Sequence, residues 1–244
     1  MLQKDFSHVP NFTGYMGVIL RVVQVGPRRQ RILDIPAGNG LLADRLRACG
    51  HEVVRADINR ERPDYVYADL NEPLPFRDAE FDTCICAEGI EHVLAPPALI
   101  HELCRATRPG GRVILSLPNI QNAYSRLNFF CKGYFFQFTP ADGRHLRAEQ
   151  RLDRGHISPV GYLQLRYLFE HNGARLVSLH GDRWKKKWLV PFLLPFLAAG
   201  WFWARMELRG ERGAARAECR EKMRHLYSPA ALLSRPLILC FARG

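Results

Sequence analysis

The stretch ILDIPAGNG, residues 32–40, is an apolar run that ends in an aspartate and then breaks into a glycine-rich turn. In a parallel α/β unit, a glycine turn between the first strand and its helix lets a ligand approach the backbone, and the helix N-terminus offers free N–H groups to an anion. The stretch therefore predicts a nucleotide-like site. The series Gly38-x-Gly40-x-x-Ala43 also satisfies the dinucleotide-binding pattern, which keeps an NAD-dependent oxidoreductase as an alternative.

Outward from this turn, short apolar runs alternate with helical patterns up to about residue 181. This alternation predicts a doubly wound α/β sheet. The expected helices lie near residues 41–49, 96–107 and 159–172, the last with Ser158 as its N-cap. The expected strands are residues 31–35, 52–56, 65–68, 82–87, 112–117 and 175–180, with a closing strand in PLILCFARG, residues 236–244.

Composition sets the outer bounds. A chain of 244 residues that is 47% hydrophobic can bury a full core, and one elaborated domain fits better than two small ones. Its net charge of +11 points to an anionic partner such as nucleic acid, an anionic membrane or a phosphorylated substrate. The seven cysteines show no C-x-x-C pair and no zinc-finger spacing, so we expect reduced thiols, a cytoplasmic location and no metal ion. The first residues, MLQKDFSHVPNFTG, show no export signal.

Three further features narrow the choice of ligand. Asp34 ends the first strand, where a dinucleotide fold normally has an apolar residue or the first glycine. Asp57 closes the second strand in VVRADIN, where its carboxylate could accept two hydrogen bonds from a ribose diol. The runs FDTCICAEGIEHV and RATRPGGRVILSLPN then give a fourth strand, a helix and a Pro-Gly-Gly turn into a fifth strand.

In this combination the chain resembles the class I S-adenosylmethionine-dependent methyltransferases, in their small-molecule branch. The likeness covers about residues 30–181 and the last strand. It implies a seven-stranded Rossmann-like sheet with an antiparallel last strand, a hydrophobic and basic insertion before that strand, and S-adenosyl-L-methionine as the cofactor. One departure is Pro36-Ala37, since the commonest form of the motif has a glycine at the first of these positions.

The resemblance also implies where the cofactor binds. Asp34, Gly38 and Gly40 match the first motif, which holds the methionine part. Asp57 matches the acidic residue that binds the ribose hydroxyls, and Ile58 would pack on the adenine.

Two further pairs of residues follow from the same resemblance. Asp69 and Leu70, in ADLNEPLPF, match the pair that reads the adenine edge and covers its ring. Ala87 and Glu88 lie where the fourth strand opens onto the sulfonium. A helix cap or a turn is the alternative for any one aspartate. Five features in the family order favour the cofactor site.

Methyl transfer to a hydroxyl needs an aligned acceptor and a group that removes its proton. Histidine suits that task at neutral pH. His92 follows the fourth strand at the edge of the sheet where ligands bind, and His156 precedes a helix in a loop that should face the acceptor. Both are candidate bases, and a structural role in their loops is the alternative. The aromatic segment NAYSRLNFFCKGYFFQF, residues 122–138, could line an apolar acceptor site or form a buried helix.

The insertion contains an apolar run, residues 188–203, bracketed by tryptophans and flanked by basic residues. As one helix it would span about 24 Å, short of a hydrocarbon core of about 30 Å. Pro191 and Pro195 would disturb that helix, so we expect no transmembrane span. Residues 183–224 hold eleven Lys and Arg against four Asp and Glu. Tryptophans and positive charge together suit an anionic membrane interface, whereas a lid or a subunit contact is the alternative.

Nucleic acid is disfavoured as the partner for two reasons. The fourth strand is followed by AEGIEH, where many base-modifying methyltransferases have Asn or Asp, two prolines and an aromatic residue, and no separate RNA-binding module fits in the chain. We therefore expect one methyltransferase domain on 1–244, peripheral on the inner face of the membrane. It has an N-terminal helical cover, 1–30, a catalytic core, 31–181 plus 236–243, and an insertion, 182–235. The acceptor is expected to be a small molecule, with a hydroxyl on a lipid-linked, prenylated or glycan-related compound. A non-catalytic module that binds a membrane or a partner is the remaining alternative.

Overall fold

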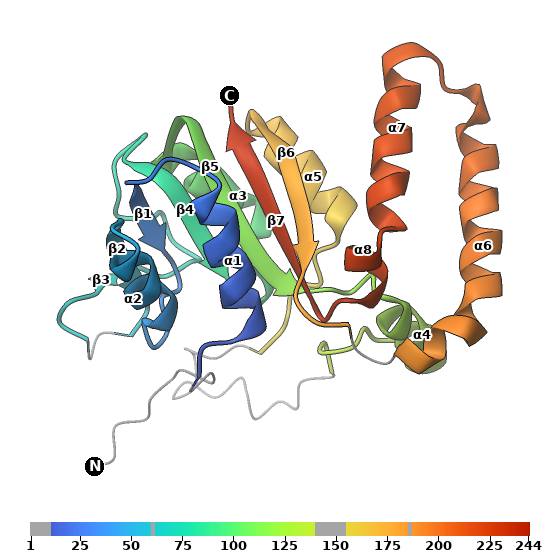
Figure 1. The fold of residues 1–244 in the computed structure, drawn as a ribbon, viewed down its shortest axis with the longest axis horizontal. Coiled ribbons are helices and arrows are strands. Elements are labelled where there is room, and N and C mark those ends of the chain that lie inside the picture. The colour runs from blue at the N-terminus through green and yellow to red at the C-terminus, as the bar shows by residue number, and fades with distance from the viewer. Residues whose placement is uncertain (1–10, 60–61, 140–154, 185–186) are drawn as a thin grey trace.

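A computed structural model describes residues 11–59, 62–139, 155–184 and 187–244. Seven strands of this part of the chain form one sheet in the order β3-β2-β1-β4-β5-β7-β6 (Figure 1). The first five strands run parallel, and β7 is antiparallel to both of its neighbours. The predicted seven-stranded sheet with an antiparallel last strand is therefore confirmed. The strands are β1 (Arg31–Asp34), β2 (Glu52–Asp57), β3 (Val66–Tyr67), β4 (Phe81–Ala87), β5 (Thr107–Pro118), β6 (Ala174–Gly181) and β7 (Pro236–Arg243).

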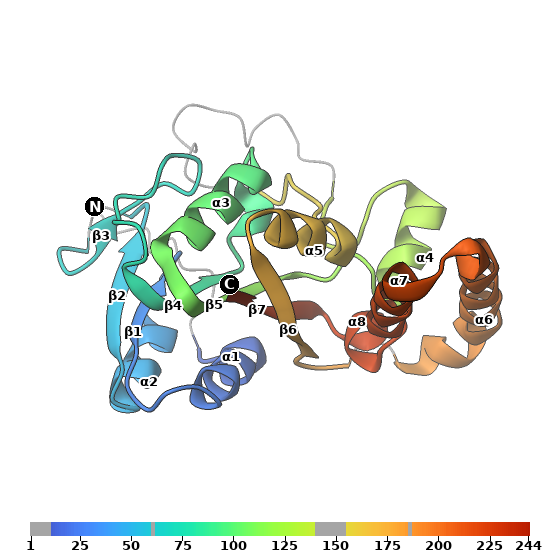
Figure 2. The same ribbon diagram turned by 90° about the horizontal axis from the view of Figure 1, so that it is seen from above.

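Helices cover both faces of the sheet (Figure 2). One face carries α1 (Gly14–Gln24) and α2 (Leu41–Ala48), and the other carries α3 (Pro96–Ala106) and α5 (Tyr162–His171). The buried residues of α5 recur at helical spacing, and among them Phe169 stacks on Phe241 of β7 with 3.9 Å between ring centroids. Because each helix buries one apolar stripe, the sheet is enclosed in two core layers.

The predicted start of α5 is wrong. The helix begins at Tyr162, and Ser158 is not its N-cap. The Ser158 hydroxyl donates instead to the Val93 carbonyl at 2.6 Å. Two backbone N–H groups of the same segment donate to the main-chain carbonyl of Glu91. These bonds hold residues 155–161 against the turn that follows β4.

The insertion between β6 and β7 forms α6 (Val190–Glu207), α7 (Gly213–Leu226) and α8 (Pro229–Leu233). Helices α6 and α7 form an antiparallel pair beyond the β6 edge of the sheet (Figure 1). Arg166 of α5 donates to Glu221 of α7 at 3.1 Å, and the Tyr162 hydroxyl lies 2.8 Å from His225 Nδ1. Helix α7 is thus tied to the core by these two contacts, although no residue of α6 or α7 is fully buried.

Helix α6 runs without a break through Pro195, so the expectation that the prolines would disturb it is wrong. Pro191 lies in the first turn, where the missing N–H has no helical partner to lose. Pro195 removes one hydrogen bond from an exposed part of the helix, where water can reach the vacated carbonyl. Among the helices of the described residues, none combines the length and the apolar character that crossing a membrane requires.

Candidate active site

The glycine turn lies between the end of β1 and the start of α2. Gly38 and Gly40 have positive φ angles of 52° and 78°, a region that residues with a Cβ rarely adopt. A Cβ on Gly40 would lie 2.6 Å from the Tyr65 hydroxyl oxygen, so the backbone must stay bare there. The Gly38 N–H donates to Asp57 Oδ2 at 2.8 Å. The structure thus brings together the ends of β1 and β2, two regions that the sequence assigned to one ligand.

Asp34 lies beneath this turn. Its side chain is buried, and Oδ2 has no hydrogen-bond partner among the described residues. Burial raises the pKa of Asp34 to about 7; Arg55 opposes the shift and the charge of Asp57 adds to it. A buried carboxylate oxygen without a donor is suited to a ligand that supplies one. The ammonium group of S-adenosylmethionine is such a donor, so the residues of this turn fit the cofactor that the resemblance implies.

Asp57 has capacity left for a ligand. Its Oδ1 accepts the N–H of Asn59 at 3.0 Å, and each carboxylate oxygen carries two lone pairs. Ile58 follows at the end of β2 and is half-buried. Asp69 is in a different state, since its Oδ1 accepts both the backbone N–H and the side-chain amide of Asn71. These bonds form a local turn, which is the alternative role considered above for any one aspartate. Asp69 still lies next to Leu70, at the same edge of the sheet.

Three loops approach one another closely beside the turn. A Cβ on Gly89, which follows β4, would lie 2.6 Å from Pro36 Cδ and 3.0 Å from Leu70 Cδ1. The loops after β1, β3 and β4 therefore meet at Gly89. This contact places Leu70 and the start of the β4 loop at one rim of the site.

Ala87 and Glu88 lie at the end of β4. Glu88 has a positive φ of 52°, and its Oε1 accepts the Ser116 hydroxyl of β5 at 2.7 Å. Desolvation raises the pKa of Glu88. Tyr15 of α1 reaches the same region: burial, with the nearby charge of Glu88, raises the pKa of its phenol. The sequence prediction missed Tyr15, because nothing in the local pattern of α1 distinguishes it from a residue that only covers the sheet.

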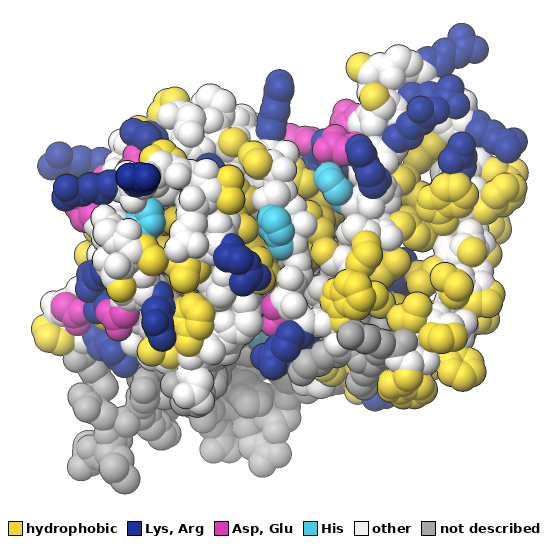
Figure 3. Space-filling model, in the orientation of Figure 1, with side chains coloured by type: hydrophobic (Ala, Val, Ile, Leu, Met, Phe, Trp, Pro, Cys, Tyr) yellow, Lys and Arg dark blue, Asp and Glu magenta, His cyan; other side chains and the backbone are white. Residues whose placement is uncertain are grey.

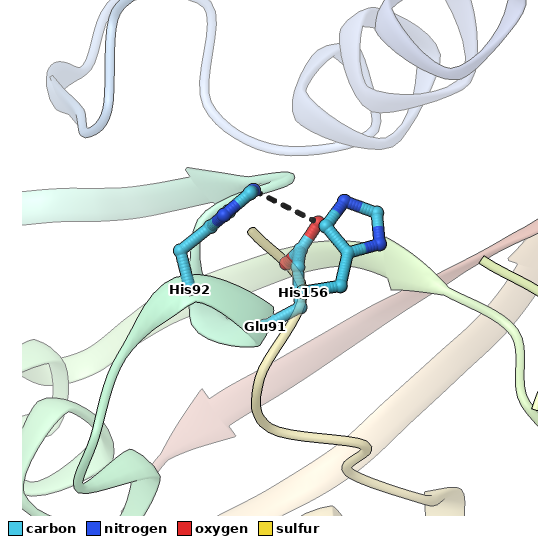
Figure 4. Close-up of side chains that lie close together, drawn as sticks. All are labelled: Glu91, His92 and His156. Carbon is cyan, nitrogen blue, oxygen red and sulfur yellow. Dashed lines mark ion pairs between the residues drawn. The ribbon is translucent and has the colours of Figure 1, made fainter. Parts of the chain in front are cut away.

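The two predicted histidines lie side by side. The His92 and His156 rings make an edge-to-face contact with 4.9 Å between centroids. His92 belongs to the 3₁₀ turn η1 (Ile90–His92), and its Nδ1 lies 3.0 Å from the Gly155 carbonyl oxygen. Glu91 of the same turn completes the group, with Oε1 4.0 Å from His92 Nε2 (Figure 4). Sequence reasoning missed Glu91, although its place next to His92 was the available signal.

Glu91 is the most enclosed member of this group. The side chain is 1% exposed, and neither carboxylate oxygen has a hydrogen-bond partner within the described ranges. Desolvation raises the pKa of Glu91, and the charge of Glu88 raises it further. An acidic group without donors in a buried position is costly to ionise unless a cation lies beside it.

A small apolar pocket lies at the same edge of the sheet as these loops. It is bordered by α4 (Ala123–Lys132), by the start of α6 and by α8. Its apolar lining includes Tyr124, Phe136, Leu189, Val190, Leu232 and Leu233. Two aromatic residues of the segment 122–138 therefore face a pocket. The helix α4 in this segment is only partly buried, since Ser125 is enclosed whereas Phe130 is 87% exposed.

Comparisons with known proteins agree with this geometry. The sequence model of a family described as a methyltransferase domain matches residues 9–179. A demethylmenaquinone methyltransferase of Clavibacter sepedonicus is 34% identical over 99 residues, which cover 35% of this chain and 40% of that protein. A ubiquinone biosynthesis O-methyltransferase of Aromatoleum aromaticum is 30% identical over 104 residues, which cover 37% of this chain and 44% of that protein. The chain thus spans less than half the length of these relatives.

Solved structures share the fold over nearly the whole chain. A SAM-dependent methyltransferase from Archaeoglobus fulgidus has a TM-score of 0.58 at 17% identity, and the match covers 94% of this chain and 93% of that one. A Burkholderia thailandensis 1,6-didemethyltoxoflavin-N1-methyltransferase, crystallised with S-adenosylhomocysteine, has a TM-score of 0.51 at 16% identity. That match covers 94% of this chain and 77% of the other. At these identities the comparison establishes the architecture.

Proposed function

This chain belongs to the class I S-adenosylmethionine-dependent methyltransferase family, and from that premise we propose that it methylates a hydroxyl of a lipid-linked, prenylated or glycan-related small molecule. Family membership removes the NAD-dependent oxidoreductase as an interpretation of the glycine turn. The observation that carries the proposal is a single sheet edge with a cofactor-type turn, a pair of histidines and an apolar pocket.

The residues for the cofactor divide by the chemistry they offer. Asp34 and the backbone at Gly38 and Gly40 would hold the methionine part, and Asp57 would accept from the ribose hydroxyls. The first role suits a buried carboxylate with one oxygen, Oδ2, that has no donor among the described residues, and the second suits oxygens with lone pairs to spare. Ile58, Leu70 and Asp69 would enclose the adenine, and Ala87 with Glu88 would border the sulfonium. S-adenosylmethionine, when bound, supplies an electrophilic methyl group.

The acceptor half of the reaction needs a group that takes a proton. His92 and His156 are the proposed groups, because both rings lie at the carboxyl edge of β4 and touch each other. The pocket beside α4 would take an apolar part of the acceptor. The names of the relatives point in the same direction, since demethylmenaquinone and ubiquinone are compounds that join a ring to an apolar chain.

The exposed face of α6 supports a membrane-bound acceptor. Phe192, Phe196 and Trp203, the α6 stripe, are 70%, 76% and 70% exposed. Their spacing of i, i+4 and i+11 places them on one face of the helix. Hydrophobic side chains gather over α6 in Figure 3, with Lys and Arg at the far end of the helix pair. We propose that this stripe enters the interface of an anionic membrane, to which the basic insertion is attracted. Lys185 and Lys186, part of that charge, lie outside the described residues.

An acceptor panel tests the activity. Purified protein is incubated with S-adenosylmethionine and a prenylated hydroquinone, the same ring without its chain, or a lipid-linked sugar, and S-adenosylhomocysteine is quantified. We expect turnover with a tailed acceptor and much less with the bare ring. His156→Ala should lower kcat by roughly 10²–10⁴-fold with unchanged cofactor affinity, whereas the control His101→Ala on α3 should not.

A negative result is equally informative. If the protein binds S-adenosylmethionine but forms no S-adenosylhomocysteine with any acceptor, the non-catalytic binding module becomes the better interpretation. Turnover with the bare ring alone would contradict the lipid-linked acceptor and leave the methyltransferase activity standing.

A further inference from the structure

The group formed by Glu91, His92 and His156 has the composition of a metal site. One ligand atom from each residue lies within 4.8 Å of the other two. Two side chains come from the turn η1 after β4 and the third comes from the segment before α5, and all three point toward one another (Figure 4). The hydrogen bonds from residues 157 and 158 to the Glu91 carbonyl hold the two segments together. The group is therefore positioned by backbone contacts that do not involve the three side chains.

The tautomer of His92 suits a ligand. Its Nδ1 lies 3.0 Å from the Gly155 carbonyl oxygen, and a carbonyl can only accept. Nδ1 therefore carries the hydrogen, and in the neutral ring the lone pair is on Nε2, the atom that faces Glu91. Histidines that bind metal ions usually donate their other ring N–H to a carbonyl or a carboxylate in this way.

Glu91 supplies an independent observation. Its carboxylate is buried, and both oxygens lack hydrogen-bond partners in the part of the chain that the structure describes. An ionised carboxylate in that position needs a cation. Among the described residues, no arginine or lysine contacts the Glu91 carboxylate. A bound divalent ion would supply the missing positive charge.

We propose that Glu91, His92 and His156 bind a divalent transition-metal ion of the Zn²⁺ type. Two imidazole nitrogens and one carboxylate oxygen favour Zn²⁺, Fe²⁺ or Mn²⁺ over Mg²⁺ and Ca²⁺, which prefer oxygen ligands alone. Three protein ligands leave coordination positions open, as catalytic zinc sites do. Ligand atoms about 2.1 Å from a tetrahedral ion lie about 3.4 Å apart. The Glu91 and His92 atoms, 4.0 Å apart, need only a small side-chain rotation to reach that spacing.

The ion would also refine the acceptor chemistry, and this part rests on the proposed function. An oxygen of the acceptor that occupies an open position would lose its proton more easily, because the ion stabilises the anion. The two histidines would then act as ligands that position the ion, in place of the proton-accepting role given to them above, and the proton of the acceptor would pass to solvent water. The acceptor class would be a molecule with an accessible phenol-like hydroxyl.

Metal titration of the protein tests the site without any methyl acceptor. After treatment with EDTA, Zn²⁺ is titrated by calorimetry and Co²⁺ by visible absorption. We expect one ion per chain and the absorption of Co²⁺ in a low-coordinate nitrogen and oxygen environment. Loss of groups that only support a ligand already weakens metal binding by 10–100-fold, so His156→Ala and Glu91→Gln should each weaken it at least as much. His101→Ala, with an exposed histidine on α3, is the matched control and should bind as wild type does.

Two outcomes would overturn the site. One is that the wild type takes up no stoichiometric Zn²⁺ or Co²⁺. The other is that His156→Ala retains the wild-type affinity, which would mean that any uptake is adventitious. Because Glu91 is buried and Glu91→Gln could unfold, His156→Ala, on a half-buried segment, decides the question in that case. Stoichiometric binding in a protein that methylates no acceptor would support the metal site and contradict the proposed function, so the two can fail separately.

Discussion

Changing Phe192, Phe196 and Trp203 together to serine should release the protein from anionic membranes without unfolding it. Full burial of a large apolar side chain contributes roughly 1.5–3 kcal/mol. Since each of the three is about 70% exposed or more, their transfer into the interface should contribute roughly 3–6 kcal/mol together. At about 1.4 kcal/mol per tenfold change, the triple variant should bind at least about 100-fold more weakly.

The assay is flotation with vesicles of phosphatidylglycerol and phosphatidylcholine, at low and at high salt. Tyr167→Ser on α5 is the matched control, because this aromatic residue is 68% exposed but lies outside the insertion. None of the three changed residues is buried, so the melting temperature should stay close to that of the wild type. The reasoning is refuted if the wild type does not float with anionic vesicles and the triple variant instead converts a dimer into a monomer in sedimentation. The α6 stripe would then be a subunit contact.

The remaining predictions concern cofactor binding and stability. Asp57→Ala should weaken the binding of S-adenosylmethionine by a few kcal/mol in calorimetry, because two charge-assisted hydrogen bonds are lost; unchanged affinity would remove Asp57 from the site. Cofactor affinity should rise about fivefold from pH 6 to pH 7, because Asp34, with its pKa near 7, must be ionised to accept from the ammonium group, which itself loses its proton near pH 8; Asp34→Asn should flatten this rise. The raised pKa of Asp34 also makes stability depend on pH. Between about pH 4 and pH 7 this carboxyl is ionised in the unfolded chain but still protonated in the unliganded fold, so the free energy of unfolding should fall as the pH rises through this range. Gly89→Ala should lower the free energy of unfolding by roughly 1–3 kcal/mol through its clash with Pro36, whereas Gly210→Ala, with open space around it, should not.

The sequence predicted the parts of the site that depend on local pattern and strand order. Asp34, Gly38 and Asp57 end or follow neighbouring parallel strands, so their meeting at one sheet edge follows from the topology. The wrong prediction for the start of α5 is explained by a single hydrogen bond. Ser158 looked like a helix cap, but its hydroxyl has a closer acceptor in Val93, and α5 starts later.

Other features required the tertiary structure. The burial of Glu91 depends on the segment before α5 that covers it, and no periodicity within AEGIEH indicates that cover. The contact between His92 and His156 joins positions 64 residues apart, which each looked like a separate candidate in the sequence. The continuity of α6 was not predicted, because proline is costly inside helices in general. In an exposed helix, water can hydrate the carbonyl that proline leaves unpaired.

The insertion begins and ends at one point of the core. Trp184, just after β6, pairs with Ser234, just before β7, and these two strands are antiparallel neighbours. A tight hairpin could therefore join β6 to β7 in place of the residues between, without any change to the strand order. Helices α6 and α7 are therefore a module that is joined to the sheet at one hairpin position and that also contacts α5 through Glu221 and His225. Changes in the length or sequence of this module can thus leave the strand order around the cofactor end of the sheet unchanged.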